Sequence, residues 1–362
     1  MPSMKKIKLI VSDLHLGKGT RFPNGVFNHL EDFQHDHRFK EFIEYYCTGE
    51  YENCEIEMIM NGDILNLIQV DYHGHYTVII TEQVSVEKLR SVLQGHPVFF
   101  DSLKKFLQDP KHSLTFVIGN HDQEMLWKGT RALFEERIGR EVAWKNTYHQ
   151  FDGIHIEHGH QYETVNRVDP TRLFLTENLP EPILNLPWGT LFTMQFIIKL
   201  KQIRPAVDKV RPFRLFIWWS FVHDTWMALY QAFKLICYFV STRFSKNRFR
   251  QSSLKMTWRM ILETSVFPDL VESAKRILRT PEIHTVIFGH THVYRHVQVG
   301  ENKQYINTGT WCDIISLDLE NYARRTRLTY VRVEYDETGT KATPLLRHWI
   351  GRIPLEDDAM GL

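Results

Sequence analysis

The sequence is poor in cysteine and carries almost no net charge. Its 362 residues include only 4 Cys, which form neither a close metal-type pair nor a disulfide framework; this excludes a small disulfide-stapled fold and indicates a reducing compartment. The formal net charge of +1 does not by itself point to an acidic partner. The apolar run near the start reaches Asp13 too soon for a signal peptide. These absences predict a cytoplasmic protein.

The sequence also lacks a long apolar run without polar interruption. The strongest candidate, residues 215–240, contains Ser220, Asp224, Gln231 and Lys234 at helical spacing, and a charged Asp in mid-helix is costly in lipid. The run therefore predicts one amphipathic helix rather than a membrane span. Residues 191–203 predict a shorter second helix. Prolines between the two runs interrupt the chain, which predicts a helical hairpin.

What the chain does contain is ordinary for a globular protein, except for histidine. Hydrophobic residues make up 43% and charged residues 24%, enough for one large α/β domain or two smaller ones. The 19 His are many, and His is the commonest metal ligand among side chains. Their positions must therefore decide what they do.

Several short apolar runs end in a Gly-containing loop that holds His, Asp or Asn. They occur in "KLIVSDLHLG", "EIEMIMNGDILN", "LTFVIGNHDQEML", "DGIHIEHGHQY" and "HTVIFGHTHVY". Short β-prone runs bounded by such loops predict buried strands. In α/β sheets, ligand sites form outside the carboxyl ends of the strands, so these tips are expected to share one crevice. The side chains gathered there would be Asp13, His15, Asp63, Asn120, His121, Asp122, His158, His290 and His292.

The residue types indicate which ions the crevice would bind. Asp, His and Asn without thiolates suit Mn, Fe, Zn or Co. Seven ligands are too many for one ion with an open position, but they suit two ions about 3.5–4 Å apart that share a carboxylate and clamp a phosphoryl group. No activated Ser or Cys nucleophile is visible near these motifs.

The ordered motifs "DLH", "GD", "GNHD", "HGH" and "GHTH", spread over residues 13–292, resemble those of the calcineurin-like metallophosphoesterase superfamily. The resemblance implies an α/β fold of the metallophosphoesterase-type α/β/β/α sandwich. It also implies roles for individual residues. The first metal would be held by Asp13, His15 and His292, the second by Asn120, His158 and His290, and both by Asp63. His121 would act on the leaving oxygen, with Asp122 fixing its tautomer, and the nucleophile would be metal-bound water or hydroxide.

More than a hundred residues separate the fourth motif from the fifth, too many for an ordinary connection. The predicted organisation is a first core part (1–165), a basic, aromatic-rich helical insertion (166–280), a second core part (281–350) and a tail (351–362). Residues 183–260 hold thirteen Lys or Arg against two Asp, and five of the nine Trp. Cations mixed with Trp, Phe and Leu are typical of helices at a membrane interface.

The insertion is therefore expected to act as a cap that contacts membrane or substrate. The residues expected to do so are Trp218, Trp219, Trp226, Arg243, Arg248 and Arg250. The competing interpretation is a helical insert packed on the sandwich or in a dimer interface. Nucleic acid is disfavoured, because the broad apolar faces exceed what phosphate binding and base stacking need.

Together these patterns predict a two-metal phosphoesterase, with manganese as the expected ion, that cleaves a phosphodiester or pyrophosphate in a lipid-linked substrate at the inner face of a membrane. This organisation is loosely similar to the UDP-2,3-diacylglucosamine hydrolases, although those typically carry Arg at the position of His121. The alternatives are a soluble protein or nucleotide phosphatase with a structural insert, and a catalytically silent membrane scaffold. His160 is left outside the predicted ligand set.

Overall fold

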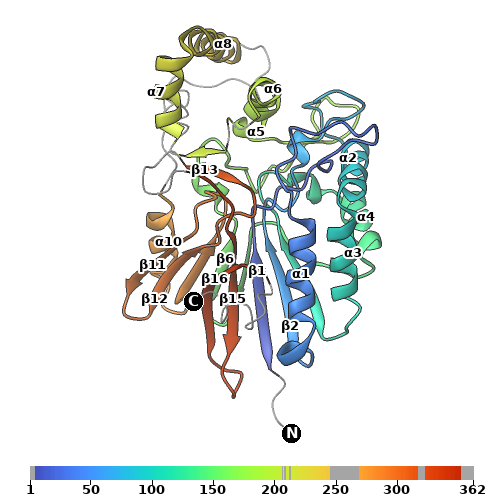
Figure 1. The fold of residues 1–362 in the computed structure, drawn as a ribbon, viewed down its shortest axis with the longest axis vertical. Coiled ribbons are helices and arrows are strands. Elements are labelled where there is room, and N and C mark those ends of the chain that lie inside the picture. Colours follow the sequence, from blue (N-terminus) through green and yellow to red (C-terminus); the bar gives the residue numbers. More distant parts are fainter. Residues whose placement is uncertain are drawn as a thin grey trace, which may run out of the picture.

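A computed structural model describes residues 5–205, 207, 209–211, 213–244, 269–316 and 323–351. In this part of the chain two mixed sheets lie face to face, with helices on their outer faces (Figure 1). The six-stranded sheet is built from β1 (Lys6–Val11), β2 (Glu55–Asn61), β3 (His112–Val117), β4 (Ala143–Lys145), β15 (Leu328–Tyr335) and β16 (Ala342–Trp349) in the order β16-β15-β1-β2-β3-β4. The five-stranded sheet is built from β5 (Tyr148–Phe151), β6 (Ile154–Glu157), β10 (Thr285–Phe288), β11 (Arg295–Gly300) and β12 (Lys303–Asn307) in the order β11-β12-β10-β6-β5.

The longer helices of the core are α1 (Asp36–Tyr46), α2 (Glu82–Gly95), α3 (Pro97–Phe106), α4 (Lys128–Ile138) and α10 (Val271–Ile277). Helices α1 to α4 lie on the outer side of the six-stranded sheet, and α10 lies on the outer side of the five-stranded sheet (Figure 1). The predicted end of the insertion at residue 280 is therefore too late, because α10 packs as part of the core. Short 3₁₀ turns η1 (Gly49–Tyr51), η2 (Leu67–Gln69), η3 (Gln123–Leu126) and η4 (His160–Tyr162) punctuate the loops. The predicted α/β/β/α sandwich is confirmed.

Strand alternation divides the buried side chains between two cores. In β1, Ile7, Leu9 and Val11 join the core beneath the helices, whereas Ile10 joins the core between the sheets. Successive residues of a strand point to opposite faces, so an apolar run buried on both sides feeds both cores. Strand β2 divides in the same way, with Met58 under the helices and Ile59 between the sheets.

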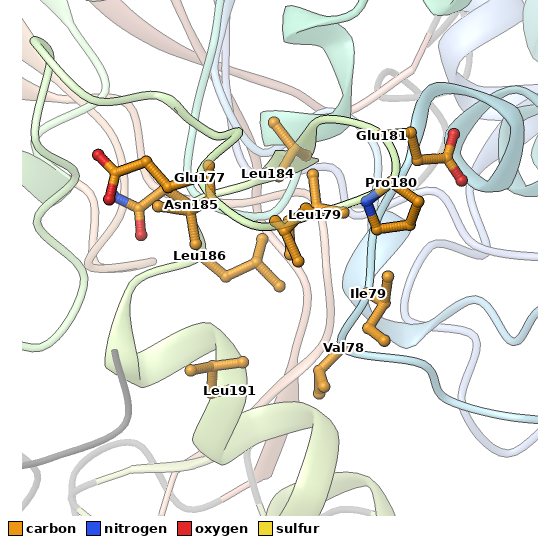
Figure 2. Close-up of a pocket in the computed structure, with 12 residues that line it drawn as sticks. Val78, Ile79, Glu177, Leu179, Pro180, Glu181, Leu184, Asn185, Leu186 and Leu191 are labelled. Atoms are coloured by element: carbon orange, nitrogen blue, oxygen red, sulfur yellow. The ribbon is translucent and has the colours of Figure 1, made fainter. Parts of the chain in front are cut away.

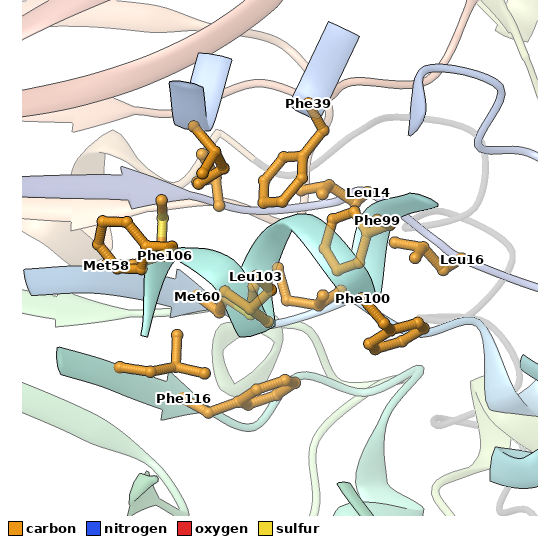
Figure 3. Close-up of a cluster of buried hydrophobic side chains, with 14 of the residues drawn as sticks. Leu14, Leu16, Phe39, Met58, Met60, Phe99, Phe100, Leu103, Phe106 and Phe116 are labelled. Atoms are coloured by element: carbon orange, nitrogen blue, oxygen red, sulfur yellow. The ribbon is translucent and has the colours of Figure 1, made fainter. Parts of the chain in front are cut away.

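The core beneath the helices is rich in aromatic rings. Figure 3 shows Phe99, Leu103 and Phe106 of α3 between Phe39 of α1 and the sheet residue Phe116. Helix α3 begins with Pro97, whose missing N–H is tolerated in the first turn, and its buried residues recur at helical spacing. The rings of Phe39 and Phe99 stack with centroids 4.1 Å apart.

The strands that lead into the predicted site are parallel to their neighbours. Strands β1 to β4 run parallel in one sheet, and β6, β10 and β12 run parallel in the other. The carboxyl ends of parallel strands meet at one edge of a sheet. In both sheets this edge lies at the end of the sandwich nearer the inserted helices (Figure 1).

The inserted region is mainly helical. It contains β7 (Phe174–Leu175), β8 (Ile183–Leu184), α5 (Trp188–Phe192), a π-helical turn η5 (Thr193–Ile197), α6 (Ile198–Ile203), β9 (Val210–Arg211), α7 (Phe213–His223) and α8 (Thr225–Arg243). Strand β9 pairs with β13 (Ile314–Ser316), which also pairs with β14 (Ala323–Arg325), so the insertion is joined to the core by backbone hydrogen bonds. Met194 and Ile198 pack against Ile68 and Ile80 of the core loops.

The single helix predicted over 215–240 is wrong, because the chain breaks at Asp224 between α7 and α8. Asp224 has a non-helical backbone, with φ −143° and ψ 50°, and its carboxylate pairs with Arg204. Asp competes with helical hydrogen bonding and favours helix ends, which accounts for the break. Among the described residues, no helix combines the length and the apolar character needed to cross a bilayer.

Candidate metal centre

The predicted metal ligands lie in the loops directly after five strands. Asp13 and His15 follow β1, Asp63 follows β2, Asn120 follows β3, His158 follows β6, and His290 and His292 follow β10. All seven are buried or half-buried. The structure therefore brings together six of the seven side chains predicted to bind metal. Asn120 lies between Gly119 and His121, whose backbones both approach Asp63.

Asp13, His15 and His292 form one cluster of ligand atoms within 4.8 Å of one another. The Nε2 atoms of His15 and His292 lie 3.0 Å apart, and Nε2 of His292 lies 3.4 Å from Oδ1 of Asp13. Two imidazole nitrogens and a carboxylate that converge on one point suit a borderline divalent cation. These are the residues predicted for the first metal.

Asp63, His158 and His290 form a second cluster of the same size. Oδ2 of Asp63 lies 3.1 Å from Nε2 of His158 and 3.9 Å from Nε2 of His15, which belongs to the first cluster. One carboxylate thus reaches both groups. This is the position that a bridging ligand needs.

Burial and neighbouring charges shift the pKa values of the site residues in different directions. Burial disfavours the charged form of Asp63, but the imidazoles of His158 and His121 outweigh it and hold the pKa of this carboxyl well below its usual range. Burial, with His121 and His292 nearby, lowers the pKa of His15 to about 3. Against burial, Asp63 and Asp13 raise the pKa of His158 to about 10. His158 would bind a divalent cation only as the neutral imidazole, because metal ligation requires the deprotonated ring nitrogen.

The backbone of the site is strained. Five predicted ligands have left-handed φ angles, a conformation that non-Gly residues adopt rarely and at a cost of about 1–3 kcal/mol. They are Asp13 (52°), His15 (55°), Asp63 (52°), His290 (70°) and His292 (62°). Gly119 lets the backbone of the loop after β3 lie against the side chain of Asp63, because a Cβ at this position would be 2.2 Å from Oδ1 of Asp63. Strain of this kind persists where function requires a fixed geometry.

Asn120 provides a test of whether the donor set fits metal ions. Its Oδ1 is buried and accepts no hydrogen bond within the described part of the chain. A buried unpaired oxygen costs about 1–3 kcal/mol unless a partner satisfies it. A divalent cation is such a partner, and the residues present therefore fit two ions.

His121 is fixed by Asn66 and not by Asp122, so the predicted partner of His121 is wrong. Nδ1 of His121 lies 2.8 Å from Oδ1 of Asn66. The carboxylate of Asp122 accepts the backbone N–H groups of Gly119 (2.6 Å) and Ile64 (3.0 Å). Asp122 therefore ties together the loops after β2 and β3. Such a backbone role cannot be distinguished in sequence from contact with the adjacent histidine.

Sequence reasoning also missed three charged residues around the site. Oε2 of Glu163 lies 2.7 Å from Nε2 of His290, the kind of carboxylate contact that orients a metal-ligating imidazole. Asp32 and Lys209 line a small pocket together with His121 and other site residues.

Sequence reasoning also missed Asn66, which could have been found from its place three residues after Asp63 in the same loop. Nothing in the sequence marks Glu163, Asp32 or Lys209.

His160 is buried beside the second cluster, with its ring centroid 5.5 Å from that of His158. Burial, with His158 and His290 nearby, lowers the pKa of His160 well below its usual value. It does not belong to the two clusters described above, nor to a third group of possible ligand atoms from His15, Asp63 and His121. It lies beside the site as a neutral imidazole.

The four cap residues that fall within the described part of the chain lie away from the metal clusters, Trp218 and Trp219 on α7 and Trp226 and Arg243 on α8 (Figure 1). Trp218 is 71% exposed, Trp226 is 85% exposed, and Trp219 and Arg243 are also exposed. Arg248 and Arg250 lie outside the described residues.

Two apolar cavities lie in or beside the insertion, and neither is lined by a predicted metal ligand. The larger, about 380 Å³, is lined by residues such as Val78, Ile79 and Leu191, with Glu177 and Glu181 among its polar residues (Figure 2). The smaller, about 240 Å³, lies between α6, α7 and α8.

No protein-family model matches the chain, and no curated protein matches it. Among solved structures, a dimetal phosphatase from Danio rerio aligns over 96% of this chain and 100% of its own, with 9% identity and a TM-score of 0.36. Vacuolar protein sorting 29 from Cryptosporidium parvum aligns over 97% of this chain and 100% of its own, with 11% identity and a TM-score of 0.26. A single mutant of Vps29 from Entamoeba histolytica aligns over 94% of this chain and 98% of its own, with 10% identity and a TM-score of 0.26. Similarities this loose carry no argument, so the resemblance to the metallophosphoesterase superfamily rests on the motifs.

Proposed function

We propose that the protein is a two-metal phosphoesterase. The observation that carries the proposal is the convergence of the predicted ligands on Asp63, whose carboxylate reaches both clusters. Two divalent ions held there would neutralise the charge of a phosphoryl group and lower the pKa of a water molecule to about 7. Manganese is the proposed ion.

The protein's own residues would bind and orient the phosphate ester. His121, His15 and His292 line a common pocket at the edge of the first cluster, and Lys209 lies in its wall. A phosphate oxygen in this pocket would lie beside the His121 ring, whose Nδ1 is engaged by Asn66. Its Nε2 is therefore the nitrogen left to exchange a proton with the leaving oxygen.

The test is metal-dependent hydrolysis. Protein stripped with a chelator and reloaded with Mn²⁺ should hydrolyse a nitrophenyl phosphodiester. The variant Asp63→Asn should lose this activity and bind one ion or none, as measured by elemental analysis. Asp101→Asn, which changes an exposed carboxylate, is the matched control and should retain both properties. Two tightly held ions and full turnover in Asp63→Asn would refute the assignment.

We propose further that the substrate is an amphiphilic phosphate compound, such as a lipid-linked phosphodiester or pyrophosphate, met at a membrane surface. The supporting observation is the run of exposed large apolar side chains on α7 and α8, far more than scattered surface residues require. The apolar cavity between α6, α7 and α8 could receive an alkyl chain. Comparing lipid pyrophosphates, lipid phosphodiesters and soluble monoesters as substrates with Mn²⁺ tests this. Equal kcat/KM for soluble and lipid-linked esters would contradict it.

A further inference from the structure

We propose that the helical insertion positions His121 for catalysis through the chain of hydrogen bonds Lys201–Asp32–Asn66–His121. The proposal rests on the proposed function, because it assumes that His121 acts on a substrate. It assigns the insertion a role in the chemistry, in addition to any contact with lipid. The residues Lys201, Asp32 and Asn66 would be positioning residues that act through His121.

The chain begins in the insertion. Lys201 of α6 is fully buried, and its Nζ lies 3.1 Å from both oxygens of Asp32 and 2.9 Å from Oε1 of Gln69. Lys209, also in the insertion, lies with its Nζ 3.0 Å from Oδ1 of Asp32. Two ammonium groups on one buried carboxylate keep Asp32 ionised and fix its position.

The ionised Asp32 determines which way Asn66 faces. A carboxylate can only accept hydrogen bonds, so the group of Asn66 that lies 3.0 Å from Oδ2 of Asp32 must be its amide Nδ2. The amide oxygen of Asn66 then faces His121. An Asn with the opposite orientation would place two acceptors against each other at Asp32.

The orientation of Asn66 in turn determines the tautomer of His121. An amide oxygen only accepts, so Nδ1 of His121, 2.8 Å away, must carry a proton. Nε2 is then the nitrogen without a proton in the neutral ring. The tautomer of a catalytic histidine is commonly set by the hydrogen bond at its other nitrogen.

The chain joins parts of the molecule that are distant in sequence. Asp32 lies in the loop before α1, Asn66 in the loop after β2, His121 in the loop after β3, and Lys201 in the insertion. Asp32, Asn66 and Lys201 are all at least nine-tenths buried. A displacement of α6 would therefore move or uncover Asp32 and loosen the His121 ring.

A double-mutant cycle tests the proposal. With Mn²⁺ and a phosphodiester that has a poor leaving group, Lys201→Met should lower kcat about tenfold or more with little change in KM, because a small misplacement of a catalytic group is costly. In a His121→Ala background, the same Lys201→Met change should have no further effect on kcat. Equal, multiplicative losses in both backgrounds would overturn the proposal.

The matched control is Glu57→Gln, since Glu57 is a carboxylate that pairs with a largely buried lysine, Lys8, in β1. The other contacts of its carboxylate are with Thr115 and His149, which are not site residues. It should leave kcat unchanged in both backgrounds. If Lys201→Met does not fold, as judged by its melting temperature, Asp32→Asn replaces it in the same cycle, because it keeps the shape of the side chain.

A spectroscopic measurement of the His121 tautomer does not depend on activity. Nitrogen NMR of the His121 ring in Zn²⁺-loaded protein should show the proton on Nδ1 and its loss from that nitrogen in Asn66→Ala. A proton on Nε2 in the unaltered protein would overturn the proposal. Absence of phosphoesterase activity with the Nδ1–H tautomer present would instead count against the proposed function alone.

Discussion

At the scale of single residues, His121 is the group whose chemistry can be separated from metal binding. Its ring lines the pocket and lies beside His15, with centroids 4.6 Å apart. One ring nitrogen of His121 lies within 4.8 Å of ligand atoms of His15 and Asp63, but the residues predicted to hold the ions are others. His121→Ala should therefore leave metal content nearly unchanged while kcat falls by about 10²–10⁴-fold, the usual contribution of a positioned acid or base. Steady-state kinetics with elemental analysis measures both.

The dependence on the leaving group shows what His121 does. If it donates a proton, the loss in His121→Ala should shrink for nitrophenolate, which leaves without protonation, and remain large for an alkoxide. An equal loss with both kinds of substrate would indicate that His121 stabilises charge on the phosphoryl group instead.

His96 is a second residue whose charge has a measurable consequence, here for stability. It is buried with Nδ1 3.0 Å from Asp36 and Nε2 3.4 Å from Glu31. Burial opposes its protonation, but these two carboxylates outweigh burial and raise the pKa of His96 to about 9. A raised pKa in the folded state stabilises the protein fully below the unfolded pKa of about 6.5, and this stability is lost as pH rises through 9.

The free energy of unfolding should therefore fall between pH 6.5 and pH 9, by at most about 3 kcal/mol from this group. Urea unfolding of His96→Gln should show a flatter dependence on pH over this window. His37→Gln, which alters an exposed histidine in the same region, should keep the dependence of the unaltered protein. The same slope in His96→Gln would mean that other groups cause it.

At the scale of elements, the sequence predicted those features that depend on local pattern. The apolar runs around Val11, Met60, Val117 and Ile287 are strands, and each carries its polar residues just past its end. Contacts between loops that are distant in sequence could not be predicted, because they leave no local pattern in the sequence. Asp32 and Asn66 are 34 residues apart and Glu163 and His290 are 127 apart, so only the folded chain shows that they touch. The break at Asp224 was missed because the sequence pattern assigned this residue to the polar side of one helix, and its ion pair with Arg204 is seen only in the folded chain.

The packing of α3 against α1 and the six-stranded sheet gives a prediction at the same scale. Phe99 is fully buried and stacks on Phe39. Phe99→Ala should reduce the free energy of unfolding by about 3–5 kcal/mol, because it removes apolar contact and leaves a cavity. Chemical denaturation measures the loss, and Lys104→Ala on the exposed side of α3 should change it little. The folded fraction of Phe99→Ala should keep its metal content, since the site lies at the strand ends.

At the scale of the whole molecule, the insertion has two unlike parts. The part that includes α6 is anchored in the core by Lys201 and by the apolar contacts of Ile198. The part formed by α7 and α8 exposes Trp218, Trp226 and Phe233. A cap that meets a lipid surface is expected to have an exposed apolar outer face. A base that is anchored in the core would keep its contact with the catalytic pocket.

Binding to lipid vesicles should therefore have two components. Burial of apolar and Trp side chains does not depend on salt, whereas attraction of the insertion's cations to anionic headgroups is screened, with a Debye length of about 10 Å at 0.1 M. Sedimentation with anionic vesicles should show binding that weakens with salt without vanishing. Neutral vesicles should bind less.

Two sets of substitutions should separate these components. Replacing Trp218, Trp219 and Trp226 with Ser should remove the salt-resistant part, and replacing Arg243, Arg248 and Arg250 with Gln should remove the salt-sensitive part. Both variants should hydrolyse a small soluble phosphodiester at the normal rate, because the metal clusters lie at the strand ends and α6 keeps its anchor at Asp32. If the protein does not bind vesicles at low salt and self-associates through α7 and α8, the exposed face belongs to a contact between copies of the chain and the lipid proposal fails.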